Sequence, residues 1–197
     1  MIFETLSFLA VEINKYLDLK MGGTTEPRLK MGNVSRALDE ALAGNVSLKS
    51  IAILSLVNIE EDRVAKQHEN EFKKGLKTIY KNPPLLLNLY ILVSINRDEY
   101  ADCLKWLGHI VQFFQYQNRF TPLTHPDLDS RIEKLTAELY TMNFEQVNHL
   151  WSTLGGKYLP SVLYKVRQLT VFEDAEVSES SLIKEIELNG KGKQAVS

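Results

Sequence analysis

The stretch that decides the fold is FEQVNHLWSTLGGKYLPSVLYKVRQLTVF, residues 144–172. Its first part predicts a short helix, because apolar residues recur at helical spacing. These residues are Phe144, Val147, Leu150, Trp151 and Leu154. Asn143 precedes them and Gln146 follows three positions later, which is the spacing of a capping box. Gly155 and Gly156 end the helix, because glycine adopts positive φ at little steric cost.

The second part of the stretch predicts a long strand. From Ser161 to Phe172 the apolar residues are rich in β-formers, and Lys165, Arg167 and Gln168 interrupt them. This pattern is typical of a strand with one well-buried face and a second face that is partly in contact with water.

Other strands are expected on both sides of this stretch. Residues 51–59 and 85–95 are nearly continuous apolar runs, too short for typical helices, and they suit strands that are covered on both faces. Residues 28–34 predict a short strand. Residues 132–142 favour a helix by propensity, but Leu135, Ala137 and Leu139 alternate with polar neighbours, so we predict a strand there.

Three further helices follow from the spacing of apolar residues. The first covers the N-terminus to about Asp18, and a short one covers 35–43 with Ser35 as its cap. A long helix has its apolar stripe from Tyr100 to Phe114, with Asn96 as its cap and Glu99 three residues later. Helices interleaved with strands predict an α/β (α+β) fold, in which a mixed β-sheet is flanked by helices.

A chain of 197 residues suits one domain. We place it at residues 1–175, followed by a polar C-terminal tail at 176–197. Within the tail, Leu182, Ile183, Ile186 and Leu188 could form a short strand on a partner's sheet edge. The polar, mostly basic segment 64–81 is expected to be a surface loop or a hairpin.

Composition excludes several classes of function. A net charge of −2 gives no general attraction to nucleic acid or to an anionic membrane. No run approaches the about 20 apolar residues of a membrane span. The N-terminus has no basic region before its apolar residues, so we expect no signal peptide and synthesis in the cytoplasm. The single Cys103 cannot form an internal disulfide and is expected to be a small buried hydrophobe.

The sequence carries no strong catalytic pattern. The four histidines lack metal-ligand spacing, so we expect no metal and no cofactor. Gly155-Gly156 follows a helix, which is the wrong topology for a nucleotide cradle. Glu60, Glu61 and Asp62 follow a buried strand, with His68 nearby, and either form a solvated turn or serve as general acid and base in an enzyme.

The pattern GGKYLPSVLYKVR, residues 155–167, resembles the tail terminator, or cap, proteins of extracellular contractile injection systems, of the Photorhabdus virulence cassette type. These systems are headless phage-tail-like particles. SLVNIEEDR at 55–63 and PPLLLNLYILVSI at 83–95 resemble the family's central strands, and 100–114 with the Phe120 region resembles its long helix. The resemblance covers about Ile2 to Ala175.

The resemblance implies a phage tail-terminator-like fold and a structural protein rather than an enzyme. It implies a ring, a homo-hexamer, that closes the end of the sheath and inner tube opposite the baseplate. The implied partners are other copies of the chain, the sheath protein and the inner tube protein, without nucleic acid or membrane. Assembly would take place in the bacterial cytoplasm, and the protein would then be part of the particle. Two alternatives stay open: an adaptor between the sheath and tube end and a separate cap, and a cytoplasmic α/β enzyme that uses Glu60, Glu61 and Asp62.

A terminator is expected to pair with open strand edges of the sheath through its own sheet or tail. The residues expected at partner contacts are Trp151, Gly155, Gly156, Lys157, Tyr158, Tyr164, Lys165, Arg167, Leu182, Ile183 and Ile186. Phe113, Phe114 and Tyr116 lie too close together on one helix to face a single core, so one of them should be exposed.

Overall fold

The computed structural model describes residues 1–37, 50–62, 71–74, 77–80, 85–171 and 178–181. The chain divides into two compact units. The first contains Met1–Ala65 and Leu85–Val171, and the second contains Lys66–Pro84 and Phe172–Ser197. The predicted division into 1–175 and 176–197 stays a prediction.

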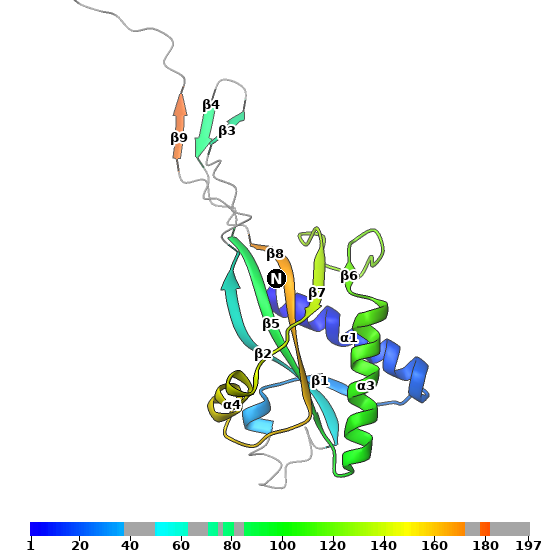
Figure 1. Ribbon diagram of the computed structural model, residues 1–197. Helices are drawn as coiled ribbons and strands as arrows, with labels where there is room; N and C mark the ends of the chain where they lie inside the picture. Colours follow the sequence, from blue (N-terminus) through cyan, green and yellow to red (C-terminus); the bar gives the residue numbers. More distant parts are fainter. Residues whose placement is uncertain (38–49, 63–70, 75–76, 81–84, 172–177, 182–197) are drawn as a thin grey trace, which may run out of the picture. The chain divides into compact units, whose positions relative to one another are not determined.

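The first unit is built on a six-stranded sheet with the strand order β1-β2-β5-β8-β7-β6 (Figure 1). The pairing of β1 with β2 is parallel, and the other pairs are antiparallel. The strands are β1 (Leu29–Met31), β2 (Ile51–Glu61), β5 (Leu85–Asn96), β6 (Arg119–Phe120), β7 (Leu135–Leu139) and β8 (Ser161–Val171). The predicted mixed sheet is therefore confirmed, and so is the choice of a strand within 132–142. The two-residue β6 was missed, because two residues carry no readable period.

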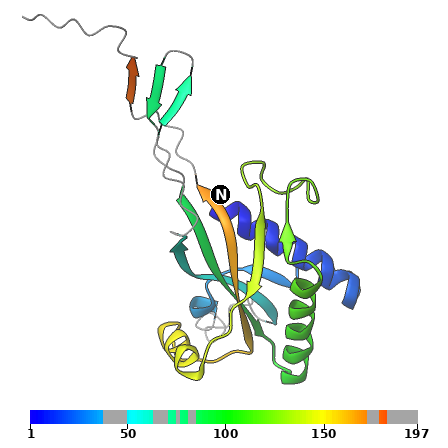
Figure 2. The same cartoon turned by 45° about the horizontal axis from the view of Figure 1, so that its top comes forward.

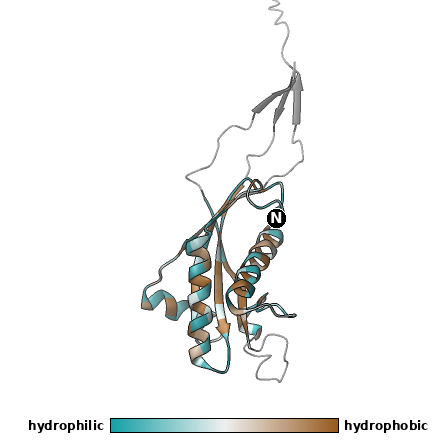
Figure 3. Cartoon of the chain, turned by 90° about the vertical axis from the view of Figure 1, so that its right-hand side faces the viewer, coloured by the Kyte–Doolittle hydropathy of each residue, from teal (hydrophilic) through white to brown (hydrophobic). Residues whose placement is uncertain are grey.

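Two long helices cover one face of this sheet, and a shorter one lies on the other face (Figures 1 and 2). The long helices are α1 (Ile2–Met21) and α3 (Tyr100–Tyr116), and the shorter one is α4 (Phe144–Thr153). Figure 3 shows that α1 and α3 each have an apolar side and a hydrophilic side. This is the pattern of helices that pack one stripe against a sheet. No helix in the described part of the chain has the length and hydropathy to cross a bilayer.

Two predicted helix caps were wrong. Asn96 is the last residue of β5, and the residue before α3 is Glu99, which makes no side-chain cap hydrogen bond. The helical turn at 34–37 begins before Ser35, and the backbone amide of Ser35 donates to Asn33 Oδ1 at 3.0 Å. Spacing alone does not show where the strand ends and the turn begins. The rest of the predicted helix 35–43 lies outside the described residues.

The main core lies between the sheet and the two long helices. Cys103 is buried in it, as predicted. Phe113 and Phe114 are also buried there, while Tyr116 is 78% exposed, which confirms that the three rings do not share one core. A second, smaller cluster lies on the opposite face of the sheet, where α4 packs. Its buried members are Val34, Ala37, Ile53, Leu92, Trp151 and Leu163.

The second unit is a three-stranded antiparallel sheet with the order β3-β4-β9. Its strands are β3 (Glu71–Lys74), β4 (Lys77–Tyr80) and β9 (Ser178–Ser181). The described part of segment 64–81 is therefore a hairpin, and the first residues of the tail form a strand beside it. Along the chain β2 leads to β3, β4 leads to β5, and β8 leads to β9, so connected strands have the same order in both sheets.

Candidate partner-binding surface

The turn between α4 and β8 is fixed by local chemistry. The backbone amide of Gln146 donates to Asn143 Oδ1 at 2.8 Å, and Gln146 Oε1 accepts from the Asn143 amide at 3.0 Å. This capping box begins α4 as predicted. At the other end Gly155 and Gly156 have φ of 105° and 75°, which confirms the predicted helix stop. The turn that follows presents Gly155, Gly156, Lys157 and Tyr158 to solvent.

Two of the residues expected at partner contacts lie in the core of this chain. Trp151 is 4% exposed and belongs to the smaller cluster, where its ring lies 5.5 Å from that of Tyr158. Tyr164 is 3% exposed, and its ring lies 4.1 Å from that of Phe114. Burial raises the pKa of the Tyr164 hydroxyl to about 12. Both side chains support the surface from beneath, and their role in partner contacts stays a prediction.

The sheet face beyond α4 carries a charged cluster that spans three strands. Lys165 Nζ of β8 lies 2.9 Å from Glu60 Oε2 of β2. Tyr90 of β5 donates from its hydroxyl to the same oxygen at 2.5 Å, and Lys165 Nζ lies 5.2 Å from the centroid of the Tyr90 ring. The hydrogen bond from Tyr90, followed by that from Lys165, lowers the pKa of Glu60. The same contact with Glu60 raises the pKa of Lys165.

A second ion pair extends this face toward β7. Arg167 Nε lies 3.1 Å from Glu138 Oε2, and about half of each side chain is exposed. Glu138 is also opposite Lys165 in the register of β7 and β8. Lys165 and Arg167 therefore lie on one face of the sheet, where they alternate with Glu60 and Glu138 in a charged row. A surface of this kind is complementary to a partner with the opposite charge pattern.

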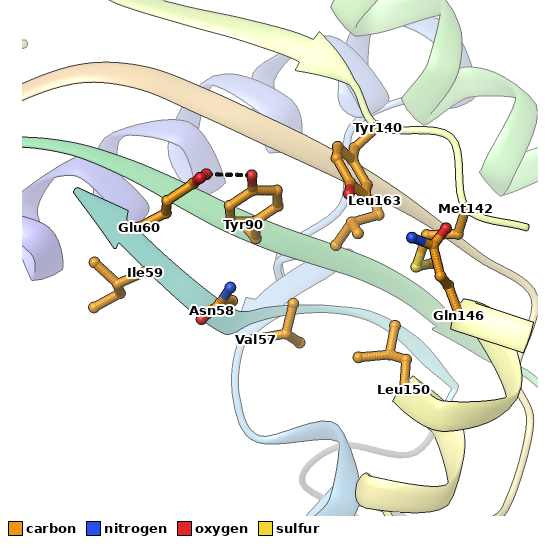
Figure 4. A pocket seen from close by; sticks show the side chains of 10 residues that line it. All are labelled: Val57, Asn58, Ile59, Glu60, Tyr90, Tyr140, Met142, Gln146, Leu150 and Leu163. Carbon is orange, nitrogen blue, oxygen red and sulfur yellow. Dashed lines mark hydrogen bonds between the residues drawn. The ribbon is translucent and has the colours of Figure 1, made fainter. Parts of the chain in front are cut away.

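An open groove of about 400 Å³ lies between this charged face and α4 (Figure 4). Tyr90 and Tyr140 meet edge to face along it, with ring centroids 5.1 Å apart. Its lining residues are Val57, Asn58, Ile59, Glu60, Tyr90, Tyr140, Met142, Gln146, Leu150 and Leu163. The lining is mostly apolar, and Glu60 is its single carboxylate.

The carboxylates of the enzyme alternative do not form a general acid-base pair in the described residues. Glu60 is engaged by Tyr90 and Lys165, which keep its carboxyl ionised. Asp62 Oδ2 accepts from Asn88 Nδ2 at 3.4 Å, and the Asp62 amide donates to the Leu86 carbonyl oxygen. His68 lies outside the described residues. Within those residues no group of histidine, cysteine and carboxylate side chains could hold a metal ion.

Sequence reasoning found the turn and the basic residues of β8 but missed the groove and the three-strand cluster. Glu60, Tyr90 and Lys165 meet only because of strand pairing, and the register of β2 against β5 shifts at a bulge between Leu56 and Asn58. That bulge sets the face on which Glu60 lies. No local pattern indicates it. Leu182, Ile183 and Ile186 lie outside the described residues.

Two solved structures share the fold of this chain. One is described as the sheath/tube terminator of an extracellular contractile injection system, PVC, in the extended state. It matches with a TM-score of 0.57 at 10% identity, over 95% of this chain and 65% of that chain. The other is described as the tube terminating cap of the anti-feeding prophage, AFP. It matches with a TM-score of 0.59 at 12% identity, over 92% of this chain and 60% of that chain.

At these identities the structural likeness shows the fold, and the chain spans less than two thirds of either relative's length. The comparison with curated proteins found no match. The family model described as the Pvc16 N-terminal domain matches residues 5–185, which is most of the sequence. The protein therefore belongs to the Pvc16 N-terminal domain family.

Proposed function

We propose that this protein ends the assembly of the sheath and inner tube of an extracellular contractile injection particle. One observation carries the proposal. A chain of this family has the fold of two proteins that are described as a sheath/tube terminator and a tube terminating cap. The role is structural and involves no chemical step.

In this proposal several copies of the chain form a ring, with six copies as the resemblance implies. The ring contacts the last sheath subunits and the last inner tube subunits. A ring closes when one surface of each copy binds a different surface of the next and the rotation between copies returns to the start. The ring assembles in the bacterial cytoplasm and remains part of the finished particle.

The exposed residues of the candidate surface are the best placed for these contacts. Lys157 and Tyr158 are exposed in the turn that follows two positive-φ glycines, where a partner can reach both side chains. Arg167 lies about half exposed in the charged row, beside Glu138. Trp151 and Tyr164 hold the turn and β8 in place from the core side.

The test is the length of the particles in cells with and without this gene, measured by negative-stain electron microscopy. A terminator predicts sheaths of broad or uncontrolled length, or no sheaths, when the gene is deleted, and normal lengths when it is restored. An unchanged length distribution with normal particle ends would overturn the proposal.

The alternative proposal is an adaptor between the sheath and tube end and a separate cap protein. Cryo-electron microscopy of the particle end with a tag fused after Ser197 separates the two roles. A terminator places the tagged ring outermost, whereas an adaptor has the density of another protein beyond it.

A further inference from the structure

The outer edge of β2 is covered over only part of its length. β1 pairs with Ala52–Leu54, and the last bond of this pairing runs from the Gly32 amide to the Leu54 carbonyl oxygen at 3.1 Å. Ser55 Oγ then donates to the Gly32 carbonyl oxygen at 2.6 Å and accepts from the Val34 amide at 3.2 Å, which anchors the chain where it leaves the edge. From Leu56 to Ile59 no strand of the described chain pairs with this edge.

This open stretch lacks most of the features that protect sheet edges. The unpaired amides and carbonyls of an exposed sheet edge can form hydrogen bonds with a strand of another molecule. Lysine, proline, other charged side chains or bulges usually prevent this pairing. The sequence from Ser55 to Ile59 is SLVNI, which contains neither lysine, proline nor any charge. Only the bulge between Leu56 and Asn58 is present. Such an edge is suited to accept a strand.

A groove of about 500 Å³ runs along the same edge. Met31, the last residue of β1, lies in its wall, so the groove continues the line of β1. Leu6, Met31 and Leu56 pack with the main core, whereas Val57 and Leu154 pack with the smaller cluster. Phe3 also lines the groove and is 68% exposed. An added strand would therefore find apolar surface on both of its faces.

The C-terminal tail has a sequence that suits this groove. Residues 182–188 are LIKEIEL, in which the adjacent Leu182 and Ile183 would point to opposite faces of a strand. Lys191 and Lys193 follow, and the open stretch of β2 leads into Glu60, Glu61 and Asp62. A tail that runs parallel to β2, as β1 does, brings its basic end to the acidic end of β2.

The topology favours the tail of another copy. All three connections between the two sheets join the three-stranded sheet at the end where Glu71, Tyr80 and Ser178 are in register. Ser181, the last residue before the tail, is in register with Lys77 at the opposite end of that sheet. The tail therefore starts at the end of the three-stranded sheet away from its connections, and each copy carries both a tail and an open β2 edge.

We infer that residues 182–188 of one copy add as a strand to the open edge of β2 in the next copy, along the groove lined by Phe3, Met31 and Leu56. The donor surface and the acceptor surface differ, so each copy can both give and receive, which links copies head to tail. This inference deepens the proposed function, because it names the contact between copies and rests on the ring proposed there. Self-association can be measured without a tube or sheath, so this contact can be disproved even where the particle-length test succeeds.

The first test is a disulfide formed between two different molecules. In a Cys103→Ser background, one chain carries Val57→Cys and the other carries Leu182→Cys, Ile183→Cys or Ile186→Cys in turn. Mild oxidation of the mixture is expected to link the two chains for at least one of these tail positions. In the matched control, a chain with Lys105→Cys, whose side chain is exposed on α3, replaces the chain with Val57→Cys.

The inference would be overturned if the tail cysteine formed a disulfide with Val57→Cys and with Lys105→Cys in equal yield. Linking that occurs only within one molecule, when a single chain carries both cysteines, would also overturn it, because the tail would then occupy its own edge. If the tail bound only to a sheath or tube protein, residues 182–188 would have a different partner. That result would contradict strand addition between copies.

The second test removes residues 182–197 and measures self-association by sedimentation. The truncated chain is expected to be monomeric at concentrations where the full chain associates. Its circular dichroism spectrum should still be that of a folded chain. Truncation after Gly190 is the matched control, because it keeps LIKEIEL and removes only the basic end, so association should persist with a weaker dependence on salt. A full chain that stays monomeric, or a truncated chain that still associates, would contradict the inference.

Discussion

At the scale of single residues, Glu60 shows how the tertiary structure gives one side chain a partner that its neighbours in sequence do not reveal. Tyr90 and Lys165 bind the same carboxylate oxygen from two other strands. The carboxylate is exposed, so the stability gained from this contact is small and screened by salt. The contact holds Tyr90 and Lys165, from two other strands, in place on this face of the sheet.

The lowered pKa of Glu60 predicts a specific pH dependence. A depressed pKa in the folded state means that the ionised carboxylate stabilises the fold above its ordinary value of 4.5. This contribution is lost as the pH falls through the lower, folded-state value. Glu60→Gln is therefore expected to lower the urea midpoint slightly near neutral pH and to show a shallower loss of stability below 4.5 than the native chain.

Urea unfolding at a series of pH values measures this difference. Glu133→Gln, at another exposed carboxylate, is the matched control for the loss of one negative charge. Parallel profiles for the native chain and Glu60→Gln would show that the contacts with Tyr90 and Lys165 contribute nothing in solution.

At the scale of elements, α4 is the clearest case of structure set by local sequence. Its first turn is closed by the reciprocal hydrogen bonds of Asn143 and Gln146, and its end is set by two glycines with positive φ. These interactions lie within a few residues of each other along the chain. They orient α4 so that Trp151 faces the sheet and the following turn faces solvent.

Loss of the cap predicts a measurable change in stability. Asn143→Ala removes the side-chain acceptor for the Gln146 amide and is expected to cost about 1 kcal/mol of unfolding free energy. Asn148→Ala makes the same chemical change at an exposed position within α4, where alanine has the higher helix propensity, so it should be neutral or slightly stabilising. Urea denaturation compares the two, and equal effects would contradict the assignment of the cap.

At the scale of the whole molecule, the sheet separates a closed face from a face with several open regions. α1 and α3 cover the first face around the main core. On the second face α4 packs on the smaller cluster, and the charged row and one groove lie beside it. Among the described residues, no strand covers the edge of β2 from Leu56 to Ile59. The proposed role, in which each copy binds neighbouring copies in a ring and the end of the sheath and tube, needs several such surfaces.

We therefore predict that the substitutions that destabilise the fold differ from those that impair termination of the particle. Trp151→Ala removes a large buried side chain and is expected to cost about 3–5 kcal/mol of unfolding free energy. Tyr158→Ala removes a ring that is 62% exposed and should cost less than about 1 kcal/mol. In cells that contain the Tyr158→Ala protein at its normal level, particles are expected to be longer or more variable in length, because the substitution alters the exposed turn.

The protein level of each variant is the control, since Trp151→Ala should act through loss of folded protein. Normal particle lengths with Tyr158→Ala would remove the turn from the proposed contact surface. A Trp151→Ala chain as stable as the native chain would contradict its place in the smaller core.

The sequence by itself determined the features that depend on neighbours along the chain. The capping box at Asn143, the helix stop at Gly155 and the strands in the apolar runs 51–59 and 85–95 follow from short-range hydrogen bonding, backbone φ and continuous apolar sequence. Cover on both faces, as predicted, holds only for part of each run, because Ile59 and Leu85 are exposed. Only the tertiary structure decided which surfaces are open. The burial of Trp151 and Tyr164 and the contact of Glu60 with Lys165 depend on strand order, register and one bulge. The same holds for the part of the β2 edge that no described strand covers. Strand order, register and the bulge are set by pairing between segments far apart in sequence, whose energies no local pattern contains.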